Sequence, residues 1–317
     1  MTDQEPLLGG VELGGTKCVC LIGTGPDDIR AQASMATGTD PARTLRRIDS
    51  LLRGWQAEHG PVRALGVASF GPIDLLRQSP RYGHITSTAK PGWSYTDVLG
   101  SLAHGRVPTV GFNTDVNGAA LAEQRWGAAQ SLGEFAYVTV GTGIGVGLIV
   151  GGRPVFGCSH TELGHLRIVR ARGDTWPGIC AFHGDCVEGL ASGPAISARM
   201  GMPASTVPAD SPVWEVVAQA LAQLLQAVVL ATSPKRIFIG GGVAEGRPGL
   251  LVRVRECLRE TLNGYLELDE LEAGMDRYIV PPGLGALAGP LGALALAADA
   301  CGAPASATRS VASVPSL

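Results

Sequence analysis

Lysine is scarce in this sequence, which contains only Lys17, Lys90 and Lys235. None of them follows the glycine spacing of a Walker phosphate loop, so that class of nucleotide site is excluded. The 25 basic residues nearly balance the 28 acidic ones, and no run of Lys or Arg is suited to following a phosphate backbone. We therefore expect no nucleic-acid partner.

Signals for export and for membrane insertion are also missing. The N-terminus carries Asp3 and Glu5 where a secretory leader would have basic residues and then an apolar core. The uncharged run over residues 281–298 is weakened by prolines and glycines, and it predicts a buried Ala/Leu helix rather than a membrane span. We expect a cytoplasmic protein whose seven cysteines stay free or bind metal.

A Rossmann dinucleotide motif is absent as well. Glycines recur at 141, 143, 145 and 147, but Val146 occupies the position where GxGxxG needs its third glycine. The residues that follow, LIVGGRPV, predict a second strand, so we expect no helix N-terminus placed here to hold a pyrophosphate. These glycines must serve another purpose.

The sequence does contain a repeated hairpin pattern. VELGGTKCVCLI, residues 11–22, places two β-prone runs around a Gly-Gly-Thr turn, and VTVGTGIGVGLI, residues 138–149, repeats it. The aligned identities are Val11/Val138, Gly14/Gly141, Val19/Val146, Leu21/Leu148 and Ile22/Ile149. Since 317 residues with 45% hydrophobic content suffice for about two domains, this duplication predicts two related α/β domains facing each other across a cleft.

Strand and helix patterns alternate along the rest of the chain. A helical face runs through 45–55, a strand is expected over 63–71, and another strand reaches Phe112 before a helix that opens at Asn117. Asp115 thus lies at the carboxyl end of a strand. Farther along we expect an apolar helix over 213–231, a strand in KRIFIGGG and a disordered tail over 303–317.

The two hairpin turns are candidates for binding phosphate. A single glycine turn is best explained by tight backbone geometry. Two such turns in facing domains, with their backbone N–H groups and the hydroxyls of Thr16 and Thr142, could together hold the phosphates of one nucleotide. Lys17 would add positive charge there.

Histidine and cysteine cluster strongly in one segment. Residues 158–186 contain six of the 13 His and Cys residues, where uniform scatter predicts about one. His165, Cys180, His183 and Cys186 offer a Cys2His2 zinc site, which would be structural because four protein ligands leave no position open for water. A redox pair would need CxxC, and unrelated thiols and histidines are the remaining explanation. Glu162 and Glu188 flank the cluster and are candidates for hydrogen-bonding a polyol.

These motifs together resemble the ROK family of sugar kinases and repressors. GGTK, TDVN, GTGIGVGLIVGG, ELGH, the CxxHxxC stretch with VEGLASGPA, and IGGGV occur in the order of that family over about residues 9–300. VELGGTK, with Glu12 replacing the usual Asp, together with AKPGW and FHGDCVEGLASGPA, is most similar to the bacterial fructokinase branch.

The resemblance implies an actin-like (ribonuclease H-like) ATPase fold, a homodimer, and transfer of the ATP γ-phosphate to a hexose with Mg2+. It implies a first domain over 1–118, completed by a C-terminal helix at 286–302, and a second over 119–285. Asp115 matches the catalytic base. The matching sugar positions are Thr114, Asp115, Glu162, His165 and Glu188, and the ATP positions are Gly15, Thr16, Lys17, Thr142, Gly143, Pro194, Gly240, Gly241, Gly242, Val243 and Ala244.

Fructose, giving fructose 6-phosphate, is the expected substrate, with mannose, glucose or an N-acetylhexosamine as alternatives. Thr114 and Thr161 replace a common Asn and Pro of the family and bear on this choice. A repressor of the family would carry an N-terminal helix-turn-helix, for which the residues before the first hairpin leave no room. A non-catalytic sugar sensor would lack the base that Asp115 provides.

Overall fold

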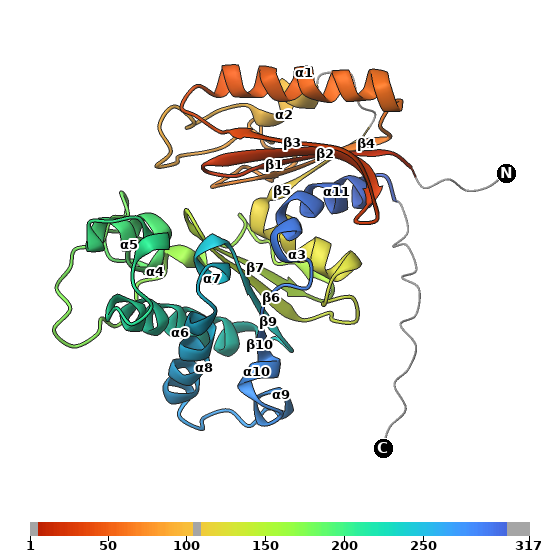
Figure 1. Cartoon of the computed structure of the whole chain (residues 1–317). Helices are drawn as coiled ribbons and strands as arrows, with labels where there is room; N and C mark the ends of the chain where they lie inside the picture. The colour runs from red at the N-terminus through yellow and green to blue at the C-terminus, as the bar shows by residue number, and fades with distance from the viewer. Residues whose placement is uncertain (1–5, 104–108, 303–317) are drawn as a thin grey trace.

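The computed structural model describes residues 6–103 and 109–302, so the tail predicted for 303–317 lies outside the described residues. The first sheet is built from the predicted hairpin outward (Figure 1). Its strands are β1 (Leu8–Leu13), β2 (Lys17–Gly25), β3 (Asp28–Ala36), β4 (Ala64–Ser69) and β5 (Val110–Thr114), in the order β3-β2-β1-β4-β5. β1 pairs antiparallel with β2 and parallel with β4.

The second sheet has the same topology. Its strands are β6 (Phe135–Val140), β7 (Ile144–Val150), β8 (Arg153–Pro154), β9 (Ile237–Gly240) and β10 (Ile279–Val280), in the order β10-β9-β6-β7-β8. β6 pairs antiparallel with β7 and parallel with β9, as β1 does with β2 and β4. The equivalence confirms the duplication that the repeated hairpins predict.

Helices cover both faces of the first sheet. α1 (Pro41–His59) begins after Asp40, whose side chain accepts a hydrogen bond from the Arg43 N–H, and it buries Leu45, Ile48 and Leu52. On the opposite face lie α11 (Ala288–Ala300) and α3 (Asp115–Trp126), between the two sheets (Figure 1). Covered on both sides, β4 is buried along its whole length. The predicted buried Ala/Leu helix is therefore confirmed as α11.

Two long helices share a hydrophobic core with the second sheet. α6 (Val213–Thr232) is long and apolar enough to cross a membrane, but most of it is buried against α4 (Val187–Ala191) and α8 (Pro248–Leu262). This burial identifies α6 as a core helix. The shorter helices are α2 (Val98–Ala103), α5 (Gly193–Met200), α7 (Gly242–Glu245), α9 (Asp269–Glu272) and α10 (Met275–Tyr278).

α3 joins the two halves of the molecule. The first half denotes here the β1–β5 sheet with α1, α2 and α11, and the second half denotes the β6–β10 sheet with its helices. α3 contacts α11 and also β6 and β7, so the predicted boundary between residues 118 and 119 falls inside a continuous helix. α11 packs on β1, β4 and β5, as expected of a C-terminal helix that completes the first half. The boundary itself stays a prediction.

Glu123 fixes the end of α3 to the loop before α11. Its side chain is buried and accepts hydrogen bonds from the N–H groups of Ala128 (2.8 Å), Gly283 (3.1 Å) and Leu284 (2.8 Å). We expect Glu123→Gln to lower the free energy of unfolding by about 2 kcal/mol, because the amide turns an NH2 group toward buried donors. Urea unfolding would measure this. Glu260→Gln, on the exposed side of α8, is the control, and equal stability of the two variants would contradict the assignment.

Candidate active site

The turn from β5 into α3 carries Asp115. The Thr114 hydroxyl accepts a hydrogen bond from the Asn117 N–H (3.2 Å), which makes Thr114 the N-cap, so α3 begins at Asp115 and not at Asn117 as the sequence predicts. Asn113 Oδ1 accepts from Asn117 Nδ2 (2.9 Å), and Asp115 Oδ1 accepts from the Val116 N–H (2.8 Å). These bonds hold the half-buried Asp115 carboxylate in a rigid turn.

Two glycines of the second hairpin allow this turn to approach β7. A Cβ atom at Gly147 would lie 3.0 Å from Asn117 Oδ1 and from the Val116 carbonyl oxygen, and one at Gly145 would lie 3.3 Å from the Val116 side chain. These glycines thus allow α3 to pack closely on β7. Their packing places Asp115 between the two sheets.

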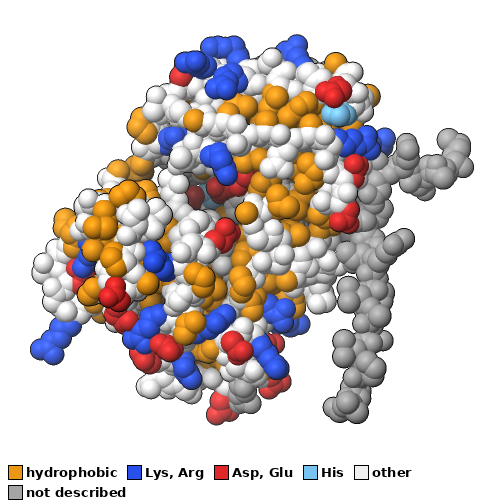
Figure 2. Space-filling model, viewed as in Figure 1, with side chains coloured by type: hydrophobic (Ala, Val, Ile, Leu, Met, Phe, Trp, Pro, Cys, Tyr) orange, Lys and Arg blue, Asp and Glu red, His pale blue; other side chains and the backbone are white. Residues whose placement is uncertain are grey.

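Acidic side chains gather around Asp115. Burial raises the pKa of Asp115 from 3.8 to about 6. Burial, and then the Asp115 charge, raises the pKa of Glu12 in β1 to about 7, while Lys17 opposes this shift. Burial followed by the charges of Asp115 and Glu188 raises the pKa of Glu162 to about 7. Acidic atoms are visible in the hollow between the two halves (Figure 2).

Glu12 is the site residue that sequence reasoning left out of its candidates. Its carboxylate lies beside the start of α11, where a Cβ atom at Gly289 would meet Glu12 Oε1. The available signal was an acidic residue between Val11 and Leu13, in a strand that is otherwise buried. Burying a charge is costly unless the charge is paired, so an acidic residue in such a strand is a candidate for a functional site.

The two hairpin turns meet across the hollow. Thr16 Oγ1 lies 3.0 Å from Thr142 Oγ1, so the predicted phosphate turns of the two halves are in contact. The Gly193 N–H donates to the Gly141 carbonyl oxygen (2.8 Å), which places the start of α5 against the second turn. The strand predicted to follow the second turn is confirmed as β7, and the helix N-terminus that contacts this turn, that of α5, comes from a distant part of the chain. The sequence GGG at the end of β9 also reaches this point, since a Cβ atom at Gly141 would lie 3.9 Å from the Gly242 nitrogen.

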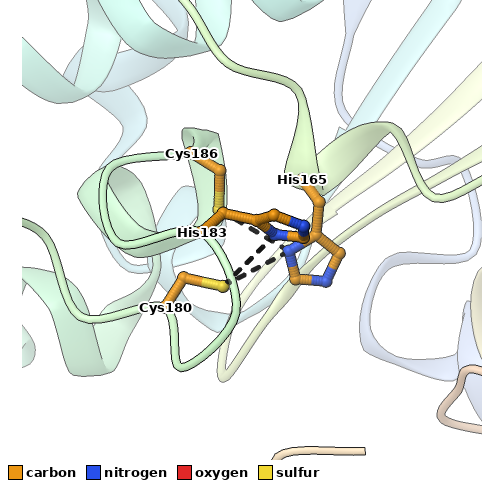
Figure 3. Close-up of side chains that lie close together, drawn as sticks. All are labelled: His165, Cys180, His183 and Cys186. Atoms are coloured by element: carbon orange, nitrogen blue, oxygen red, sulfur yellow. Dashed lines mark hydrogen bonds between the residues drawn. The ribbon is translucent and has the colours of Figure 1, made fainter. Parts of the chain in front are cut away.

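His165, Cys180, His183 and Cys186 form one cluster (Figure 3). Cys180 Sγ lies 3.6 Å from His165 Nδ1 and 3.7 Å from His183 Nδ1, and Cys186 Sγ lies 3.5 Å from His165 Nδ1. A tetrahedral zinc ion with ordinary Zn–S and Zn–N bonds separates its sulfur and nitrogen ligands by about 3.6 Å. The geometry of the four side chains therefore fits zinc.

The candidate metal cluster of His165, Cys180, His183 and Cys186 is connected to the predicted sugar residues through His165. With Nδ1 facing the cluster, His165 Nε2 lies 3.9 Å from Glu188 Oε1. Glu188 Oε2 accepts a hydrogen bond from the Ile144 N–H of the second hairpin (3.0 Å). Glu188 thus joins the cluster to the hairpin, whereas Thr114 uses its hydroxyl as a helix cap and is buried. The assignment of these residues to a sugar stays a prediction.

Ion pairs support the loop that leads to Cys180. The Asp174 side chain, 7% exposed, pairs with Arg170 and with Arg199 of α5, both at 2.9 Å. Burial disfavours the Asp174 carboxylate, but the hydrogen bonds from Arg199 and Arg170 outweigh it and lower the pKa to about 2. Arg170 also pairs with Asp185 (3.1 Å) next to Cys186, so the loop and α5 form one unit.

Comparison with known proteins identifies the family. The sequence profile of the ROK family matches residues 8–300. The chain belongs to the ROK family. A fructokinase of Pediococcus pentosaceus is 40% identical over 291 residues, which are 92% of this chain and 97% of that protein. A fructokinase of Zymomonas mobilis subsp. mobilis is 38% identical over 301 residues, covering 94% of this chain and 98% of the relative.

The crystal structure of a ROK hexokinase from Thermus thermophilus superimposes on this ROK protein with a TM-score of 0.71 at 28% identity, covering 92% of this chain and 97% of the hexokinase. The two equivalent sheets and this similarity confirm the predicted actin-like α/β fold. Both the family and the fold expected from the motifs are thus confirmed.

Proposed function

We propose that this ROK protein is an ATP-dependent fructokinase that transfers the γ-phosphoryl group of ATP to D-fructose and forms fructose 6-phosphate. The observation that carries the proposal is the position of Asp115, a half-buried carboxylate at the start of α3, where α3 packs on the second hairpin and Glu12 and Glu162 lie nearby. The fructokinases that match this chain over nearly its whole length support fructose as the sugar.

Asp115 is the base of the proposed reaction. Phosphoryl transfer needs a group that takes the proton of the attacking hydroxyl, and positions that hold the donor and acceptor in line. Glu162, His165 and Glu188, with Thr114 beside the base, would bind the sugar. The Asp115 carboxylate would accept the proton of the fructose 6-hydroxyl as the oxygen attacks the γ-phosphorus.

ATP would lie across the turns that meet opposite Asp115. Backbone N–H groups and threonine hydroxyls suit phosphate oxygens, and Lys17 adds positive charge. The proposed ATP residues are Gly15, Thr16, Lys17, Thr142, Gly143, Pro194, Gly240, Gly241, Gly242, Val243 and Ala244. The bond between Gly193 and Gly141 and the contact between Thr16 and Thr142 support a single binding site.

Two metals fit the residues present. The Glu12 carboxylate, near Asp115 and Lys17, offers oxygens of the kind that Mg2+ prefers and leaves Asp115 to act as the base. Mg2+ bound with ATP would neutralise phosphate charge. Zn2+ on His165, Cys180, His183 and Cys186 would have four protein ligands and so a structural role.

We further propose that the protein is a cytoplasmic homodimer. Each chain would have a first domain over 1–118, completed by the helix near 286–302, and a second domain over 119–285. Mannose, glucose and N-acetylhexosamines are the alternative substrates. A coupled ATP-consumption assay across these sugars and fructose, with the product identified by phosphorus NMR, tests the proposal. Turnover should be highest with fructose and yield the 6-phosphate; a protein inactive on every sugar would not be a sugar kinase.

A further inference from the structure

His160 lies between the two halves and belongs neither to the metal cluster nor to the proposed sugar residues. It follows β8, two residues before Glu162, and its side chain is 1% exposed. A buried imidazole has two nitrogens that need partners. In this protein the partners come from different halves of the molecule.

The Nε2 atom of His160 bonds to the first half. It accepts a hydrogen bond from the Ile73 N–H (3.0 Å), in the loop that follows β4. A ring nitrogen that accepts carries no hydrogen, so the ring is neutral and Nδ1 carries the proton. Burial lowers the pKa of His160, which favours the same neutral form.

The Nδ1 atom of His160 faces the sugar side of the second half. It lies 3.3 Å from the Thr161 carbonyl oxygen, to which it donates, and 3.4 Å from Glu162 Oε1. The proton therefore faces both the peptide before Glu162 and the Glu162 carboxylate. Held from this side, Glu162 keeps its other oxygen for a ligand.

The loop bonded to His160 also touches Glu162 directly. A Cβ atom at Gly71 would lie 3.1 Å from Glu162 Oε1 and 3.3 Å from His160 Cε1. The loop is fixed within its own half, because the Pro72 carbonyl oxygen accepts a hydrogen bond from the Thr86 N–H (2.7 Å). The Gly71–Ile73 loop, His160 and Glu162 thus form one packed unit across the two halves.

We propose that His160 is a positioning residue that ties the loop of residues 71–73 to Glu162 and so fixes the Glu162 carboxylate for binding the hexose. The inference rests on the proposed function, because that function assigns Glu162 to the sugar. Both bonds are needed. The bond from the Ile73 N–H to Nε2 fixes the His160 ring to the first half, and the Nδ1–H of the ring then holds the Glu162 carboxylate.

Two substitutions separate the two bonds. His160→Asn keeps an amide donor near the Nδ1 position but removes the acceptor at the Nε2 position. His160→Gln keeps an acceptor near the Nε2 position but removes the donor near Nδ1. We expect His160→Asn and His160→Gln each to raise the KM for fructose about tenfold, nearly as much as His160→Ala, with the KM for ATP within about twofold of wild type. His59→Gln, at the end of α1 beside Glu58, is the matched control and should leave both constants unchanged.

A KM for fructose equal to that of the wild type in either variant would overturn the inference. Equal increases in the KM for fructose and the KM for ATP would also overturn it, because they would indicate a general loss of order in the active site. If thermal melts show that the His160 variants do not fold, Gly71→Ala replaces them. It puts a methyl group against the Glu162 carboxylate and should raise the KM for fructose alone, and an unchanged KM would overturn the inference. If the wild-type protein is inactive on fructose, both the proposed function and the inference are contradicted. If the wild-type protein is active and the variants have an unchanged KM for fructose, the inference alone is contradicted.

Discussion

Asp115→Asn should lower kcat by a factor on the order of 10² to 10⁴, because the amide cannot accept the proton of the attacking hydroxyl. The affinity for ATP should stay within about threefold, since Asp115 lies outside the hairpin turns that would hold the phosphates. Steady-state kinetics and calorimetric titration with a non-hydrolysable ATP analogue measure the two quantities. Asp210→Asn, on an exposed loop, is the control.

The same variant should separate lost chemistry from lost stability. The fold raises the pKa of Asp115 from 3.8 to about 6, so the ionised carboxylate destabilises the folded state above about pH 6, and this cost shrinks as the pH falls from about 6 to 3.8. Asp115→Asn is neutral at every pH and should melt at or above the wild-type temperature at pH 8. Near-normal turnover, or an inactive variant that melts much lower, would rule out the assignment of the base.

The acid limb of the pH profile should come from the same carboxylates. A base works only when ionised, so kcat/KM for fructose should fall as the pH drops below about 6, the pKa of Asp115 in the free protein. Protonation of Glu162, whose pKa is about 7, should lower kcat/KM at a somewhat higher pH, because Glu162 would bind the sugar. A kcat/KM for fructose that stays flat down to pH 5 would contradict the role of Asp115.

Local patterns explain why much of the fold could be predicted. Each hairpin has alternating β-prone residues around a glycine turn, and both patterns are complete within about a dozen residues. The clustering of the candidate zinc ligands was also predictable, because Cys180, His183 and Cys186 stand on one short loop. The start of α3 was not, since Thr114 and Asn117 can both cap a helix and the choice is made by the pairing of β5 with β4, which extends to Thr114.

The contacts that assemble the site have no local signal. Glu12 approaches Asp115 because only β4 separates β1 from β5, the strand that Asp115 follows. Gly193 reaches Gly141 because α5 returns to the second hairpin. The bond between His160 and Ile73 joins residues 87 positions apart. The sequence therefore supplied the chemical groups, while their distances depend on the tertiary fold.

Substitution of one candidate zinc ligand is the second change that we expect to reduce activity strongly. Native protein is expected to contain one zinc ion per chain, and Cys180→Ser should lose it, since a hydroxyl replaces a thiolate at a site where Cys180 Sγ lies within 3.7 Å of two histidine nitrogens. Without the ion, His165 is no longer held with Nε2 toward Glu188, and kcat/KM for fructose should fall on the order of 10²-fold. Metal analysis by mass spectrometry and kinetics on the same preparation test both statements.

The control for this prediction is another cysteine of the same segment. Cys158 is exposed and lies outside the cluster, so Cys158→Ser should keep both zinc and activity. A structural ion predicts that Cys180→Ser and chelator-treated wild type lose thermal stability together with activity, and that zinc restores only the treated wild type. Glu188 accepts a hydrogen bond from the Ile144 N–H of the second hairpin, whose turn would hold ATP phosphates, so a smaller rise in the KM for ATP should accompany the loss of sugar binding. Full activity in zinc-free wild type would show that the four side chains hold their geometry without a metal.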